Sequence, residues 1–156
     1  MAQPFPNHPN LRGGFAPLQM ECDVNDLVIE GEIPRALNGS FYRNGPNPQY
    51  APRGHYHWFG GDGMVHAFHV EDGRVAYRNR WVRTIKWQKE REAGRSLFSA
   101  FNPLDNDDSV AGLETDGVAN TNIIWHGGKL LALEEGHAPF ELDPHNLESI
   151  GPHIYG

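Results

Sequence analysis

The segment from Met64 to Trp81 constrains the fold more than any other part of the sequence. It reads MVHAFHV, then Glu-Asp-Gly, then RVAYRNRW, so two runs rich in valine and aromatic residues flank a turn sequence. An Asp-Gly pair between two such runs is typical of a β-hairpin, because both residues accept the backbone angles of a tight turn. The segment therefore predicts two antiparallel strands.

Further segments favour short strands joined by turns. Residues 39–50 (GSFYRNGPNPQY) indicate a strand that enters a turn, 120–136 contain a Gly-Gly turn between two strands, and 139–151 contain a short strand closed by Asp-Pro. Eighteen glycines and twelve prolines in 156 residues suit this pattern better than a helical bundle. Three hairpin-like units at a spacing of roughly forty residues are typical of β-propeller blades. The predicted fold class is all-β.

The chain is short for a whole propeller. A blade takes about 40–50 residues and a closed propeller needs about 4–8 blades, so this chain would supply only part of one. Residues 1–25 are expected to form an amino-terminal arm, and residues 26–156 a partial β-propeller. Residues 86–98 (KWQKEREAGRSLF) are polar and charged without a clear apolar face, which predicts a surface loop with at most one helical turn.

Charge and cysteine content restrict the function classes. The formal net charge of −7 argues against binding to a nucleic acid, which would need a basic face. The single cysteine, Cys22, excludes an intrachain disulfide and fits a reducing compartment. No apolar run reaches the ~18 residues of a membrane span, and no signal peptide is visible. We expect a cytoplasmic protein without a transmembrane segment, and a weak association with a membrane surface stays open.

The stretch HWFGGDGMVHAFHV (57–70) raises three alternatives: a metal site, a phosphate-binding loop or a turn between strands. His66 and His69 are three apart on a predicted strand, so their side chains point to opposite faces and cannot both hold one metal ion. His55 and His57 lack a third ligand at a recognisable spacing. The lysine of a P-loop is absent. The stretch is best explained as a turn that enters a strand, with close backbone packing at Gly60, Gly61 and Gly63.

Several motifs in a fixed order carry a family resemblance. GEIPRALNGSFYRNGPNP, HWFGGDGMVHAFHVEDG, ANTNIIWHGGKLLALEEG and FELDPHNLESIG together resemble the amino-terminal part of the carotenoid cleavage oxygenase family, over roughly residues 26–151. This family includes apocarotenoid and lignostilbene dioxygenases, and the chain is closer to the lignostilbene branch. The resemblance implies a seven-bladed β-propeller, of which this chain supplies the arm and roughly the first two to three blades.

The resemblance also implies an iron-dependent reaction. Four histidines from different blades hold Fe(II), and O2 is used to split a C=C bond into two carbonyl products. Neutral imidazole ligands leave the full charge on the metal and leave coordination positions for O2. The first of these histidines normally follows the LDPHNLESIG segment, and none of the nine histidines here matches a ligand. The ligands are therefore expected beyond Gly156, and the 156 residues alone are expected to be inactive.

Glu135 matches a glutamate that, in this family, accepts a hydrogen bond from an iron-bound imidazole. Such a carboxylate fixes the orientation of the ring and raises its basicity. The alternative is an ordinary solvated glutamate at the edge of a strand. Because neighbours on a strand point to opposite faces, Glu134 and Glu135 are not expected to address the same histidine.

Phe59, Phe101 and Glu134 fall at positions that surround the substrate in the lignostilbene branch. That branch uses a tyrosine and a lysine to hold and deprotonate a phenol hydroxyl, and the corresponding residues here are Phe101 and Glu134. A phenylalanine cannot hydrogen-bond a phenolate, and a glutamate would repel it. This departure argues against cleavage of 4-hydroxystilbenes. It leaves a small apolar or aromatic alkene as the partner of O2, either an apolar polyene or a non-phenolic aromatic alkene. For Phe101, plain packing is the alternative.

Two function classes follow. The first is the amino-terminal part of an iron-dependent dioxygenase that cleaves a carotenoid, apocarotenoid or stilbene-type alkene. The second is a non-catalytic β-rich binding or scaffold module that lacks the iron site. A Ser/Thr-Ala-His-Pro motif and three further histidines encoded after Gly156 would favour the enzyme.

Overall fold

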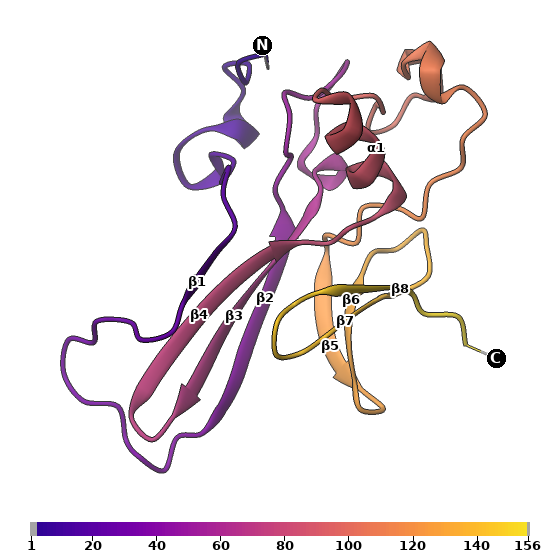
Figure 1. Cartoon of the computed structure of the whole chain (residues 1–156). Helices are drawn as coiled ribbons and strands as arrows, with labels where there is room; N and C mark the ends of the chain where they lie inside the picture. The colour runs from indigo at the N-terminus through magenta and orange to yellow at the C-terminus, as the bar shows by residue number, and fades with distance from the viewer. Residues whose placement is uncertain (1–2, 156) are drawn as a thin grey trace.

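Two antiparallel sheets dominate the computed structural model, which describes residues 3–155 (Figure 1). The first sheet has the order β1-β4-β3-β2. Its strands are β1 (Cys22–Val24), β2 (Gly39–Pro46), β3 (Gly63–Glu71) and β4 (Arg74–Trp81). The second sheet has the order β5-β6-β7-β8. Its strands are β5 (Asn122–His126), β6 (Lys129–Leu133), β7 (Phe140–Leu142) and β8 (Ser149–Pro152).

The predicted hairpins are confirmed. Glu71 pairs with Arg74, and the turn residues Asp72 and Gly73 both have positive φ angles, of 45° and 77°. These angles match a two-residue hairpin turn, which explains why Asp-Gly is found there. Gly127 and Gly128 play the same part between β5 and β6, with φ angles of 57° and 78°.

The third predicted unit is not a separate blade. Its strands β7 and β8 extend the second sheet, because β7 pairs with β6. The described residues thus form two four-stranded sheets. Two is the lower end of the predicted range of two to three blades. Strand β1 lies at the end of the segment that was expected to be an arm, and pairs with β4.

The hydrophobic core lies between the two sheets. Val65 and Ala67 of β3 pack in one buried cluster with Leu130 and Ala132 of β6. The first sheet closely approaches the segment that leads into β5 at Gly63, whose N–H donates to the carbonyl of Val118 at 2.8 Å. A Cβ atom at Gly63 would overlap the carbonyl of Ala119, and one at Gly60 would overlap the Ala100 side chain. The predicted close backbone packing at these glycines is confirmed.

One α-helix is present in the described part of the chain, and it corrects the predicted surface loop over residues 86–98. Helix α1 spans Ile85–Ala93. It begins at Thr84, whose Oγ1 accepts a hydrogen bond from the Trp87 N–H, and ends at Gly94, which has a left-handed conformation. The sequence showed no apolar face because two of the three buried residues, Lys86 and Glu90, are charged.

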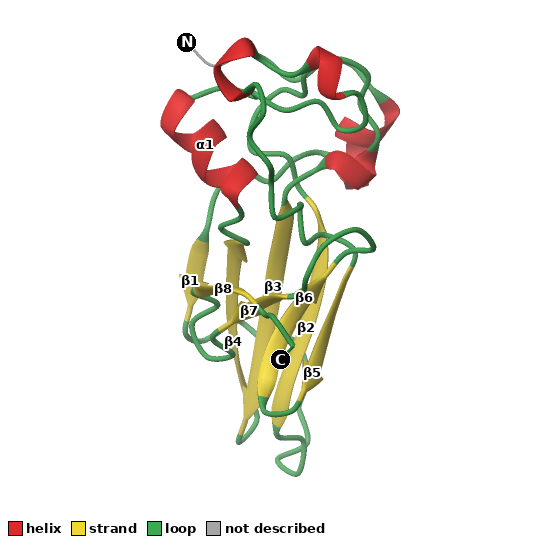
Figure 2. Cartoon of the chain, turned by 90° about the vertical axis from the view of Figure 1, so that its right-hand side faces the viewer, coloured by secondary structure: helices red, strands yellow, loops and turns green. Residues whose placement is uncertain are grey.

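Short 3-10 helices complete the structure, and α1 lies with them beyond one end of the strands (Figure 2). They are η1 (Pro9–Leu11), η2 (Gly13–Phe15), η3 (Trp58–Gly60), η4 (Pro103–Asp105) and η5 (Asp108–Val110). Over residues 3–155, no helix has the length and apolar character needed to cross a membrane.

Candidate functional site

A cleft of about 590 Å³ borders all four residues that the sequence singled out. Phe59, Phe101, Glu134 and Glu135 come from three separate segments and share this one cavity. The residues that line it lie outside the strands, in loops, turns and helices. We call residues 98–106 the loop wall of the cleft, and residues 115–120 together with 134–137 its turn wall.

Aromatic side chains form one side of the cleft. Phe59 and Phe101 each have 60% of their surface exposed, although both are large apolar residues. The ring of His57 lies between them, with its centroid 4.5 Å from that of Phe59 and 5.8 Å from that of Phe101. Exposed aromatic rings that line a concave surface are suited to contact an apolar or aromatic ligand.

A buried ion network supports the loop wall. Lys86 Nζ lies 2.7 Å from Asp62 Oδ1 and 3.0 Å from Glu90 Oε2, and all three residues are buried. Burial alone would lower the pKa of Lys86, but the two carboxylates outweigh it and raise the pKa above its ordinary value. Lys86 therefore carries a positive charge, which balances the negative charges of the two buried carboxylates.

The second oxygen of Glu90 connects this network to the loop wall. Glu90 Oε1 accepts hydrogen bonds from the N–H groups of Leu97 at 2.9 Å and Phe98 at 3.0 Å, and from Ser96 Oγ at 3.2 Å. The helix thus fixes the segment that leads into Phe101. Sequence reasoning missed these residues, although Thr84 as a helix cap and the i, i+4 spacing of Lys86 and Glu90 were signals of a helix.

Glu134 is fixed within the turn wall. Its Oε2 accepts hydrogen bonds from the N–H groups of Val118 at 2.8 Å and Ala119 at 3.3 Å. Its Oε1 forms a hydrogen bond with Nδ1 of His137. Gly117, with a φ of 87°, packs against this pair, and a Cβ there would overlap both the carboxylate and the imidazole.

Glu135 has a different environment. Its side chain is exposed at the cleft, and Thr121 Oγ1 donates a hydrogen bond to its Oε2 at 3.2 Å. The expectation that Glu134 and Glu135 point to opposite faces of a strand was wrong, because β6 ends at Leu133 and both residues border the same cleft. The two carboxylates therefore differ in their hydrogen-bond partners, and not in the face of a strand to which they point.

The histidines of β3 lie as predicted. His66 Nδ1 is hydrogen-bonded to the hydroxyl of Tyr77, and His69 Nδ1 to that of Ser40, both at 2.7 Å. Burial lowers the pKa of both rings. Within residues 3–155, no three His, Cys, Asp or Glu side chains cluster closely enough to hold a metal ion.

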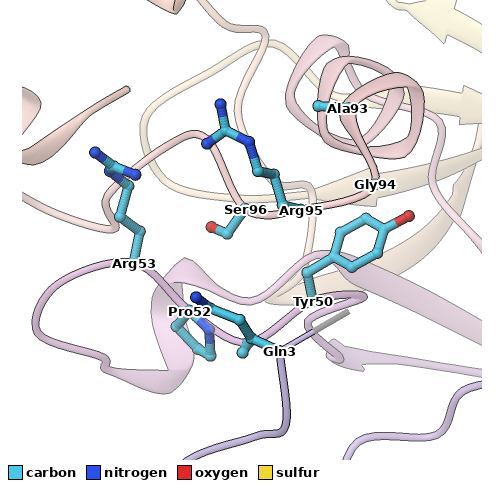
Figure 3. Close-up of a pocket in the computed structure, with 9 residues that line it drawn as sticks. Gln3, Tyr50, Pro52, Arg53, Ala93, Gly94, Arg95 and Ser96 are labelled. Atoms are coloured by element: carbon cyan, nitrogen blue, oxygen red, sulfur yellow. The ribbon is translucent and has the colours of Figure 1, made fainter. Parts of the chain in front are cut away.

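A second hollow, of about 520 Å³, lies beside the end of α1 (Figure 3). Figure 3 shows Tyr50, Arg53 and Arg95 around it. Both arginines form ion pairs with the same carboxylate, that of Asp107. Their charges are thus already paired, and Tyr50 is the one aromatic residue that lines this hollow.

Known proteins resemble this chain over nearly its whole length. The family model described as retinal pigment epithelial membrane protein matches residues 15–156. The chain belongs to the carotenoid cleavage oxygenase family. The isoeugenol monooxygenase of Pseudomonas nitroreducens is 47% identical over 156 residues, which cover 99% of this chain and 32% of that enzyme.

Solved structures of this family share the fold. Lignostilbene dioxygenase from Pseudomonas brassicacearum is 40% identical, with a TM-score of 0.90 over 97% of this chain and 32% of its own. A variant of Synechocystis apocarotenoid oxygenase is 36% identical, with a TM-score of 0.78 over 90% of this chain and 31% of its own. The chain thus spans about a third of the relatives that it matches, and it forms part of a β-propeller.

Proposed function

We propose that this chain is the amino-terminal part of a non-haem Fe(II)-dependent dioxygenase that cleaves a C=C bond with O2 and forms two carbonyl products. The cleft carries the proposal, because in a chain of this family it combines two exposed aromatic rings with an exposed carboxylate, that of Glu135. The iron ligands are proposed to come from the rest of the protein, and Fe(II), when bound, supplies the chemistry of O2.

The substrate class that the cleft supports is an alkene conjugated to an aromatic ring. Phe59 and Phe101 offer flat apolar surfaces on which such a ring can pack. The relatives named above for isoeugenol and lignostilbene are more similar to this chain than the apocarotenoid oxygenase is. The aromatic lining of the cleft and the similarity to these relatives both favour an aryl alkene over a long polyene as the substrate.

Glu135 is proposed to position an imidazole ligand of the iron. Its Oε2 is hydrogen-bonded by Thr121, which orients the carboxylate, and its side chain stays exposed at the cleft. A carboxylate that accepts the N–H of a metal-bound imidazole fixes the tautomer of the ring. Glu134 is less suited to this role, because both of its oxygens have partners within the turn wall.

The test uses the full-length, iron-loaded protein. It is incubated with O2 and, separately, with isoeugenol, a stilbene and an apocarotenoid, and the carbonyl products are identified by mass spectrometry. We expect two carbonyl fragments from the aryl alkenes, formed at a higher kcat/KM than from the apocarotenoid. Absence of cleavage of every alkene in iron-loaded protein would reject the enzymatic function, and faster cleavage of the apocarotenoid would reject the substrate class.

A further inference from the structure

The turn wall contains a paired carboxylate and imidazole that the proposed reaction does not use. The side chain of Glu134 is 10% exposed, whereas that of His137, which also lines the cleft, is 42% exposed. Glu134 is thus the fixed partner, held by two backbone N–H groups, and His137 is the partner that a ligand can reach.

This pairing determines which nitrogen of His137 is free. A carboxylate on Nδ1 favours the tautomer with the proton on Nδ1, and this leaves a lone pair on Nε2. Nε2 can then accept a hydrogen bond from a ligand hydroxyl. In an aromatic cleft, such an acceptor recognises a ring that carries an O–H group.

Gly117 distinguishes this pair from an ordinary His–Glu contact on a protein surface. Its φ of 87° and its missing Cβ leave the space that the Glu134 carboxylate and the His137 imidazole occupy. The N–H groups that hold Glu134 come from the two residues that follow Gly117. The same short segment therefore provides both the room and the hydrogen bonds for the pair.

We propose that His137, oriented by Glu134, binds the hydroxyl group of a hydroxylated aryl alkene. The inference rests on the proposed function for the alkene itself. The phenol O–H donates to Nε2 of His137. If the proton is transferred, the O–H bond breaks, an N–H bond forms, and a phenolate remains beside an imidazolium whose charge Glu134 balances.

The inference revises the expectation that Glu134 disfavours a phenol. Glu134 would repel a phenolate that it met directly, but His137 occupies one of its oxygens and presents an acceptor nitrogen instead.

Ligand binding to the iron-free, full-length protein tests the inference without the reaction. 4-Hydroxystilbene and 4-methoxystilbene are compared by fluorescence titration, since the methyl ether has no proton to donate. We expect the phenol to bind about 10-fold more tightly, the usual effect of one well-placed hydrogen bond. His137→Ala and Glu134→Gln should each reduce this preference to about twofold or less.

His153→Ala is the matched control. His153 Nδ1 lies 3.1 Å from Glu141 Oε2, so it forms a second His–Glu pair, but it does not line the cleft. This variant should keep the full preference for the phenol. An equal preference in wild type and His137→Ala, or the same loss in His153→Ala, would overturn the inference.

A second readout separates this inference from the proposed function. In the iron-loaded protein, His137→Ala should lower kcat/KM for the phenol and leave that for the methyl ether within about twofold. If the wild-type protein cleaves neither alkene, the proposed function fails, and the binding titration still decides the role of His137.

Discussion

The two walls of the cleft are held in different ways. The loop wall depends on buried charges, since Glu90 connects Lys86 and Asp62 to the backbone that precedes Phe101. The turn wall depends on backbone N–H groups and on the small volume of Gly117. A buried charge that loses its partner costs far more than one hydrogen bond. A substitution that breaks the loop wall should therefore destabilise the whole fold. A substitution that breaks the turn wall should reduce ligand binding before it destabilises the fold.

The largest expected effect follows from removing the cation of the loop wall. Lys86→Met leaves Asp62 and Glu90 buried without a counter-ion, and should lower the free energy of unfolding by about 3–5 kcal/mol. Lys89→Met is the control on the same helix, because Lys89 forms an exposed pair with Glu92 and should cost less than about 1 kcal/mol. Chemical denaturation of the full-length variants measures both. Equal stabilities would show that the network does not hold the wall.

Glu135→Gln should lower iron affinity by about 10- to 100-fold, the usual cost of losing a carboxylate behind a metal-bound imidazole. Metal analysis after dialysis against a weak chelator gives this value independently of turnover. Glu134→Gln is the neighbouring control and should retain its iron, because Glu134 is occupied by the turn wall. The assignment is wrong if both variants hold iron as tightly as the wild type.

A comparison of Gly117, in the turn wall, with Gly112, outside it, separates the cost of backbone strain from the cost of lost packing. Gly117 and Gly112 have φ angles of 87° and 73°, so an alanine at either position costs about 1 kcal/mol of strain. Only at Gly117 would the new methyl group meet other atoms. Gly117→Ala should therefore lose about 1–2 kcal/mol more than Gly112→Ala in thermal or chemical unfolding. Matching losses would contradict the close packing of the pair.

The smallest effect is expected at the aromatic rim of the loop wall. Phe101→Ala should raise KM for an aryl alkene by about 10-fold, or about 1.4 kcal/mol of lost apolar contact, with little change in stability. Leu104→Ala provides the comparison, because Leu104 is 93% exposed and does not line the cleft. Steady-state kinetics in which both variants have the same KM would assign Phe101 to packing alone.

Local turn chemistry made most of the fold predictable. Asp72-Gly73 and Gly127-Gly128 specify their hairpins from two adjacent residues, because few other pairs adopt two positive φ angles. The number of sheets was less certain, because sequence spacing does not say whether β7 pairs with β6 or begins a new sheet. That choice depends on contacts between residues far apart in the chain.

The site was predictable only where a motif marked it. Phe59, Phe101, Glu134 and Glu135 were found through resemblance, and they do border one cleft. Lys86 was missed because its partner Asp62 lies 24 residues earlier, so its charge looked like that of a solvated residue. His137 was missed because its significance depends on Gly117, which no local pattern connects to it.

The close contact at Gly63 limits how the family can exchange blades. Main chain of β3 there meets main chain of the segment that leads into β5, with no side chain between them to adjust the spacing. In a recombined protein whose crossover separates residues 63 and 119, these two backbone segments come from different parents. Their spacing must then be reproduced closely, because protein interiors are tightly packed. Crossovers placed after β8 avoid this seam. The first two blades should therefore be inherited, and engineered, as one unit.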